Sequence, residues 1–305
     1  MKIVVTTDKP FAPDATEKIQ AILEKEGFVF EKLEKYTEKL QLLEAVKEAT
    51  GIIIRSDIID EEVMQHAPHL KIIVRAGAGY DNVDIAAASA RNICVMNTPG
   101  QNANAVAELV FGLLLCQQRN HFDGSTGREI KGRRLGLFAF GYVAKKVAKI
   151  AAGFQMPLYS YSLIPRERNK SDFGVTQVDS ATELFENSDI VSLHMPLIEQ
   201  TRQLINYNLL AKLPNDGIVI NTARKEVINE DDLMQIMEER PNFQYITDIK
   251  PDKHDEFTAK FPKTYFATPK KTGAQTEEAN YNAGVAAAEQ IVGFLKNGDE
   301  KFRVN

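Results

Sequence analysis

Residues 134–144 read RLGLFAFGYVA, and this stretch decides the fold. Its first half, as far as Ala139, is apolar enough for a strand buried on both faces, and a helical pattern begins after Gly141. A strand, a short turn with glycine and a helix are the start of a unit that joins parallel strands. A doubly wound parallel sheet is therefore predicted around this turn.

The same alternation of strand and helix extends in both directions. The predicted strands cover Ile3–Thr7, Gly51–Ile54, Lys71–Val74, Ile93–Met96, Leu158–Tyr161, Ile190–Leu193, Ile218–Asn221, Tyr245–Asp248 and Tyr265–Ala267. Helical patterns include Asp14–Glu26, a long helix from about Asn102 to Gln118, and a last one from Thr276 to Asn297. The segment NTPG at 97–100 interrupts the series, so two α/β domains are predicted.

Composition agrees with a two-domain globular protein. The chain has 305 residues, 44% of them hydrophobic and 26% charged, and a net charge of −5 that argues against nucleic acid or an anionic membrane as the main partner. No apolar run reaches the ~18 residues of a membrane span, and the N-terminus resembles a strand rather than a signal peptide. Cys94 and Cys116 form no metal pattern; we expect buried free thiols, no metal and a cytoplasmic location.

The turn at 139–144 has the place and spacing of G-x-G-x-x-G in a dinucleotide-binding fold, with alanine at the first and third glycine positions. Gly141, the central glycine, lets the backbone approach a pyrophosphate, which the first amides of the helix at Tyr142 and Val143 can bind. On this motif alone, an ordinary strand–helix turn is the alternative interpretation.

Ser162 directly follows the next predicted strand, at the position where an acidic residue usually holds the adenosine ribose. Arg166 and Arg168 follow closely. A neutral residue with nearby arginines is how such sites accept a 2′-phosphate, so NADP is an alternative to NAD. Solvated loop arginines are the other interpretation.

Further motifs follow one another along the whole chain. They are IRS at 54–56, AGAGYDNVD at 76–84, NTPGQN at 97–102, AVAE at 105–108, SLHMP at 192–196, NTAR at 221–224 and TD at 247–248. In order and spacing they resemble the D-2-hydroxyacid dehydrogenase family, and within it the short 3-phosphoglycerate dehydrogenases without a regulatory domain. The resemblance implies two doubly wound parallel-sheet domains with a cleft between them. A flavodoxin-like substrate domain would comprise residues 1–98 and 276–305, and a Rossmann-type cofactor domain residues 99–275. It also implies a homodimer.

The resemblance assigns roles residue by residue. Arg224 matches the arginine that grips the substrate carboxylate and polarises the C2 oxygen. Arg55 and Ser56 are candidates for the substrate phosphate. The other implied substrate contacts are Gly77, Ala78 and Gly79, whose amides can hold a carboxylate, and Asn102. The other implied cofactor contacts are Val106, His194, Pro196, Thr201, Thr222, Ala223, Asp248 and Gly273. A core histidine is the alternative for His194.

The family pattern Thr-Pro-His-x-Gly-Ala reads TPKKTGA at 268–274, so a lysine replaces the catalytic histidine. Counting back from Gly273 gives Lys271, and counting forward gives Lys270; we prefer Lys271, because the Gly-Ala side leads into the last helix. The glutamate that orients the histidine is also missing, and Lys253 falls near its place. The chain therefore resembles a lysine-type subgroup.

A neutral lysine can take the C2 hydroxyl proton as hydride leaves. The ordinary pKa of lysine is about 10.4, so this work near pH 7 needs a pKa lowered by about 3, on the order of 4 kcal/mol. Burial and a nearby Arg224 both act in that direction. The alternative is that both lysines only bind substrate anions.

The expected activity is oxidation of 3-phosphoglycerate with NAD, the first step of L-serine biosynthesis. Reduction of hydroxypyruvate or glyoxylate is an alternative that needs no phosphate-binding residue. A non-catalytic cofactor-binding homologue is another: the missing histidine and glutamate favour it, and the intact Arg224 and Asp248 oppose it.

Overall fold

The computed structural model describes residues 1–163 and 173–305, so Arg166 and Arg168 lie outside the described residues. The chain divides into two compact units: unit 1 is Met1–Asn102 with Gln275–Asn305, and unit 2 is Ala103–Ala274. Within the described part, no helix combines the length and apolar character needed to cross a membrane.

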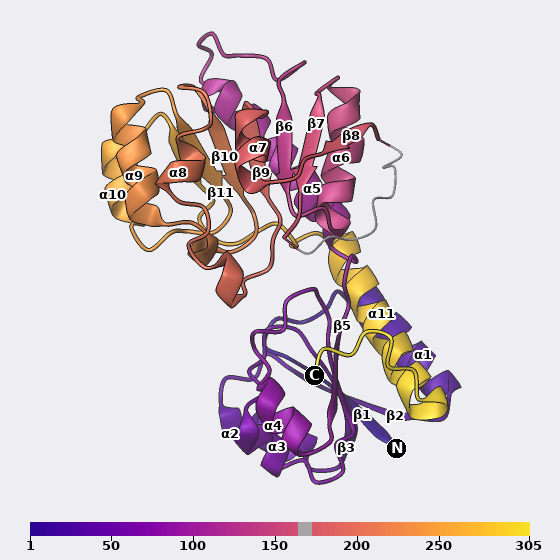
Figure 1. Cartoon of the computed structure of the whole chain (residues 1–305). Coiled ribbons are helices and arrows are strands. Elements are labelled where there is room, and N and C mark those ends of the chain that lie inside the picture. The colour runs from indigo at the N-terminus through magenta and orange to yellow at the C-terminus, as the bar shows by residue number, and fades with distance from the viewer. Residues whose placement is uncertain (164–172) are drawn as a thin grey trace. The chain divides into compact units, whose positions relative to one another are not determined.

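Unit 1 is a parallel sheet covered by helices on both faces (Figure 1). Its strands are β1 (Lys2–Thr7), β2 (Val29–Glu34), β3 (Ala49–Ile54), β4 (Ile72–Arg75) and β5 (Cys94–Asn97). Its helices are α1 (Pro13–Lys25), α2 (Lys39–Val46), α3 (Glu61–Gln65), α4 (Ile85–Ala90) and α11 (Glu277–Asn297). The strand order β2-β1-β3-β4-β5 is that of flavodoxin-like folds.

The last helix, α11, completes the core of unit 1, and Figure 1 shows it alongside α1. The Thr276 hydroxyl accepts from the Ala279 amide at the start of α11, and Gly298 ends the helix in the left-handed conformation. A Cβ at Gly284 would lie 2.9 Å from Ile19 Cδ1 and 3.0 Å from Phe11 Cε1. Glycine at this position therefore lets the two helices approach closely.

Unit 2 contains a longer parallel sheet with the strand order β12-β11-β10-β9-β6-β7-β8. Its strands are β6 (Leu135–Phe138), β7 (Leu158–Tyr161), β8 (Val175–Gln177), β9 (Ile190–Leu193), β10 (Ile218–Asn221), β11 (Gln244–Thr247) and β12 (Tyr265–Ala267). Its α-helices are α5 (Ala103–Gln118), α6 (Tyr142–Gly153), α7 (Ala181–Glu186), α8 (Tyr207–Leu210), α9 (Glu230–Glu239) and α10 (His254–Lys260). The direction of winding reverses between β6 and β9, and ligands of such sheets bind beyond the carboxyl ends of the strands at this point.

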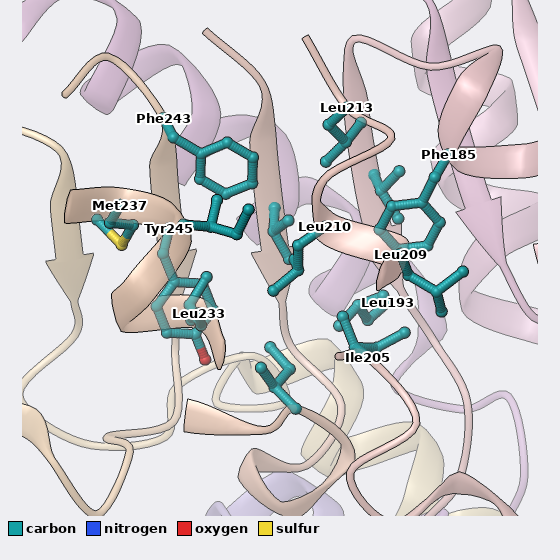
Figure 2. Close-up of a cluster of buried hydrophobic side chains, with 14 of the residues drawn as sticks. Phe185, Leu193, Ile205, Leu209, Leu210, Leu213, Leu233, Met237, Phe243 and Tyr245 are labelled. Carbon is teal, nitrogen blue, oxygen red and sulfur yellow. The ribbon is translucent and has the colours of Figure 1, made fainter. Parts of the chain in front are cut away.

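Apolar side chains fill both faces of this sheet. Helices α5 and α6 pack on one face through residues such as Val110 and Val147. Helices α7 to α10 cover the other face, where Figure 2 shows Phe185 and Leu209 in one part of the cluster and Tyr245 in another. Burial on both faces explains why the central strands are continuous apolar runs.

The structure confirms two parallel-sheet α/β units. Strands β2 and β8 were not predicted, because they are edge strands whose residues are exposed or half-buried and form no apolar run. Cys94 is buried as expected, whereas Cys116 is only half-buried; both thiols are free.

Candidate active site

The end of β10 makes a tight turn that is held by its own last residue. The Asn221 side chain donates from Nδ2 to the Arg224 carbonyl (2.9 Å), and its Oδ1 accepts from the Ala223 amide (3.0 Å). Asn221 is fully buried, so its amide has no competing water. The turn therefore presents Thr222, Ala223 and Arg224 at the carboxyl edge of the sheet in a fixed conformation.

Two cationic side chains meet at one carbonyl oxygen of this turn. Arg224 donates from Nη1 to the Ala223 carbonyl (2.9 Å), and Lys271 Nζ lies 3.4 Å from the same oxygen. Lys271 comes from the loop after β12, so the fold brings together the two residues predicted to be catalytic. Lys271 and the neighbouring Lys270 are both exposed, so the burial expected for the base is not seen. The Lys270 carbonyl accepts from the Thr268 hydroxyl.

Asp248, directly after β11, anchors the loop that carries Lys271. Its Oδ2 accepts from the Gly273 amide at 2.8 Å, and the Thr272 amide also donates to this carboxylate. Burial raises the pKa of Asp248, although these amides and Lys271 partly offset the rise. A Cβ at Gly273 would lie 2.8 Å from Asp248 Oδ2 and 3.4 Å from Val106 Cγ2 in α5, so only glycine fits comfortably here.

Three neighbouring strands each end beside a buried polar atom without a partner. His194 follows β9, Thr222 follows β10 and Asp248 follows β11. Among the described residues, His194 Nε2, Thr222 Oγ1 and Asp248 Oδ1 make no hydrogen bond. Burial lowers the pKa of His194 to about 3, so its ring is neutral. Unpaired buried polar groups are costly, and their position at the carboxyl edge fits a site for a polar ligand.

The turn between β6 and α6 has the form expected for a dinucleotide pyrophosphate. Gly141 is the N-cap of α6 without a side-chain hydrogen bond, and a Cβ added there would meet nothing within 4 Å. Tyr142 is exposed and Val143 half-buried, while Ala139 at the first glycine position has a φ of +69°. The space beside Gly141, at the start of α6, is therefore open, and the N-terminus of a helix is a suitable place for a phosphate.

Ser162 follows β7 and reaches this turn, because its Oγ accepts from the Phe140 amide at 2.9 Å. The loop after β9 is also tied internally: the Thr201 hydroxyl donates to the Pro196 carbonyl (2.7 Å) and accepts from the Ile198 amide (2.8 Å). Thr201 is buried and Pro196 exposed. The Thr201 hydroxyl therefore shapes the loop.

In unit 1, Arg55 is held by its own domain. Nη1 donates to the carbonyls of Lys9 (2.8 Å) and Pro10 (2.9 Å), and Nη2 donates to Asn280 Oδ1 (2.6 Å). The neighbouring Ser56 hydroxyl donates to Asp8 Oδ1 at 2.9 Å. Both predicted phosphate contacts thus have partners within unit 1, and one of these is a carboxylate.

Another arginine, Arg75 at the end of β4, lies against the predicted carboxylate loop. A Cβ at Gly77, whose φ is +150°, would lie 1.6 Å from Arg75 Nη1, so the guanidinium packs directly over the glycine. The Gly77 carbonyl accepts from the Thr98 amide (2.9 Å) and the Ala78 carbonyl from Asn97 Nδ2 (2.6 Å). Gly79 continues this loop, and Asn102 is half-buried just before α5. Arg75 is not among the residues predicted from the sequence, although it immediately precedes the Ala76-Gly77 motif.

The other candidates for a base or an orienting group have different partners. Lys253 forms an ion pair with Asp231 of α9, and His254 Nδ1 lies 2.8 Å from the Tyr265 hydroxyl. No cluster of His, Cys, Asp or Glu that could hold a metal exists in the described ranges.

Comparison with known proteins gives consistent matches. The family model "D-isomer specific 2-hydroxyacid dehydrogenase, catalytic domain" matches residues 4–305. A solved 3-phosphoglycerate dehydrogenase of Entamoeba histolytica with bound NAD+ is 48% identical, has a TM-score of 0.90, and is matched over 100% of this chain and 98% of that one.

Curated relatives include enzymes of different substrate specificity. The hydroxypyruvate reductase of Thermotoga maritima is 34% identical over 94% of this chain and 96% of its own length. The D-3-phosphoglycerate dehydrogenase of Methanocaldococcus jannaschii is also 34% identical, over 85% of this chain, but the match spans only 52% of that enzyme.

Proposed function

Because the chain belongs to the D-isomer specific 2-hydroxyacid dehydrogenases, we propose that it transfers hydride between C2 of 3-phosphoglycerate and NAD. This reaction is the first step of L-serine biosynthesis. The contact of Arg224 and Lys271 with one carbonyl carries the chemical part of the proposal, because it joins an anion-binding guanidinium to a proton-accepting amine. The 48% identity to the Entamoeba enzyme supports the choice of substrate.

A bound nicotinamide cofactor would supply the hydride acceptor for this reaction. Arg224 binds the substrate carboxylate and polarises the C2 oxygen, for which a planar guanidinium with several donors is suited. The neutral amine of Lys271 takes the hydroxyl proton at Nζ. The Ala223 carbonyl and the Asn221 turn hold the two groups together.

The cofactor is assigned to unit 2. The amides at the start of α6 would bind the pyrophosphate, and His194, Thr222 and Asp248 would satisfy their unpaired atoms on the nicotinamide side. Ser162 would lie at the adenosine ribose, with NADP as the alternative cofactor. We further propose a homodimer located in the cytoplasm, whose mass analytical ultracentrifugation would measure.

Within unit 1, the amides of residues 77–79 stay candidates for binding a substrate carboxylate. Arg55 already donates to three acceptors of its own unit, which argues against its predicted role as the phosphate contact. That same observation favours a second candidate function. A hydroxypyruvate or glyoxylate reductase needs no phosphate-binding residue, and the Thermotoga relative is named a hydroxypyruvate reductase.

The test compares 3-phosphoglycerate with D-glycerate, and hydroxypyruvate with glyoxylate, using both NAD(H) and NADP(H). If a charged phosphate contact worth roughly 2–5 kcal/mol exists, kcat/KM for 3-phosphoglycerate exceeds that for D-glycerate by about 30-fold or more. Equal values, or faster reduction of hydroxypyruvate, would support the reductase. Binding of NADH without any turnover would support the non-catalytic homologue.

Lys271→Ala tests the base, and Lys270→Ala is its matched control. Loss of a general base lowers kcat by ~10²–10⁴, so the Lys271 variant should be nearly inactive while it still binds NADH, and the Lys270 variant should remain active. In the wild type, oxidation should become faster with rising pH and reduction slower, because only the neutral amine accepts the proton. The reverse ranking of the two variants would move the base to Lys270.

A further inference from the structure

Thr272 follows the proposed base, Lys271, and precedes Gly273, whose amide donates to Asp248. It occupies the variable position of the family pattern. Its hydroxyl oxygen is buried and makes no hydrogen bond to any described residue. A threonine hydroxyl rarely stays unpaired in a protein interior, because burial without a partner costs free energy that any polar ligand can recover.

The backbone at this position is fixed. The Gly273 amide donates to Asp248 Oδ2 at 2.8 Å, and the Thr272 amide also donates to this carboxylate. On the other side, Lys271 Nζ reaches the Ala223 carbonyl. The Thr272 side chain therefore starts from a segment that is held at both ends.

Thr272 and Asp248 each have a buried oxygen that makes no hydrogen bond to a described residue, and the two oxygens differ in what they can bind. Asp248 Oδ1 is an acceptor and has no partner among the described residues, and Thr272 Oγ1 carries a proton that it can donate. A primary carboxamide satisfies both, because its NH2 donates to the carboxylate while its carbonyl accepts from the hydroxyl. The nicotinamide ring bears such a group.

We propose that Thr272 is a cofactor-binding residue, whose hydroxyl donates to the carbonyl of the nicotinamide carboxamide while Asp248 accepts from the carboxamide NH2. The inference rests on the proposed use of a nicotinamide cofactor. The two contacts hold the carboxamide at both ends, and so fix which face of the ring is presented to the substrate.

Thr272→Val removes the hydroxyl and keeps the shape, and Thr272→Ser keeps the hydroxyl. Loss of one neutral hydrogen bond should weaken NADH binding about 3- to 10-fold in the valine variant, measured by calorimetry, whereas the serine variant should bind like the wild type. ADP-ribose, which lacks the nicotinamide, should bind all three proteins equally. Equal weakening of NADH and ADP-ribose would show that Thr272 acts only through the fold.

An analogue separates the two contacts. In 3-acetylpyridine adenine dinucleotide a methyl group replaces the NH2 and the carbonyl remains. Thr272→Val should weaken the analogue as much as NAD+, whereas Asp248→Asn should weaken NAD+ much more than the analogue. If Thr272→Val leaves the affinity for both dinucleotides unchanged, the assignment of Thr272 is wrong.

The free protein provides a readout that does not depend on the cofactor. Replacing an unpaired buried hydroxyl by a methyl group should leave the melting temperature unchanged or raise it, while the rise induced by saturating NADH becomes smaller. A lower melting temperature of the free valine variant would show that the hydroxyl is already paired. Wild-type protein that binds no NADH would instead overturn the proposed function.

Discussion

Replacing Ala139 with glycine should stabilise the protein. Ala139 connects β6 to α6 with a φ of +69°, in the left-handed region. This conformation costs a residue with a Cβ roughly 1–2 kcal/mol, and glycine adopts it freely. Glycine also makes the unfolded chain more flexible, which offsets about 0.4–1 kcal/mol. The net gain in the free energy of unfolding should be about 0.5–1 kcal/mol.

Ala144→Gly is the matched control, because it makes the same chemical change in the same motif. Ala144 lies inside α6 and is 0% exposed. Glycine there costs about 1 kcal/mol of helix propensity, and the lost buried methyl adds roughly 0.8 kcal/mol. The control should therefore destabilise the protein by about 1–2 kcal/mol, with the opposite sign.

Urea unfolding of the free variants measures both effects as shifts of the midpoint at an unchanged slope. The Ala139 variant should shift to higher urea and the Ala144 variant to lower urea. If both variants shift to lower urea, the positive φ at Ala139 carries no strain and the argument is refuted.

Arg224→Ala should raise the activation free energy that corresponds to kcat/KM by roughly 2–5 kcal/mol and raise KM for the acid, because a charged hydrogen bond to the substrate is lost. Steady-state constants near the wild-type values would show that Arg224 does not bind the substrate. Ser162→Asp should shift the ratio of kcat/KM values toward NAD and away from NADP, because a carboxylate accepts from the ribose hydroxyl but repels a phosphate; an unchanged ratio would place Ser162 away from the ribose. His194 has a depressed pKa of about 3, so its contribution to stability is complete above the unfolded value near 6.5 and is lost as the pH falls toward 3. The free energy of unfolding should fall by up to about 1.4 kcal/mol per pH unit in that window, and the non-titrating His194→Gln variant should show a flatter dependence in denaturant titrations at several pH values.

Much of the architecture follows from local pattern. Strands such as β9 and β10 are apolar along their whole length because helices cover both faces of a parallel sheet, and their predicted bounds match the structure. The edge strands β2 and β8 were missed, because residues open to solvent leave no such run.

The sequence by itself also determined which residues to examine in the site, because motifs at the carboxyl ends of parallel strands converge on one edge. Only the tertiary structure decided how these residues are used. Arg55 donates to Asn280, a residue of the last helix, and Arg224 shares a carbonyl with Lys271, which lies on a different loop. Hydrogen-bond partners so distant in sequence leave no periodic signal, since they are selected by the packing of whole elements. For the same reason the unpaired atoms of Thr272 and Asp248 became visible only once every neighbour was in place.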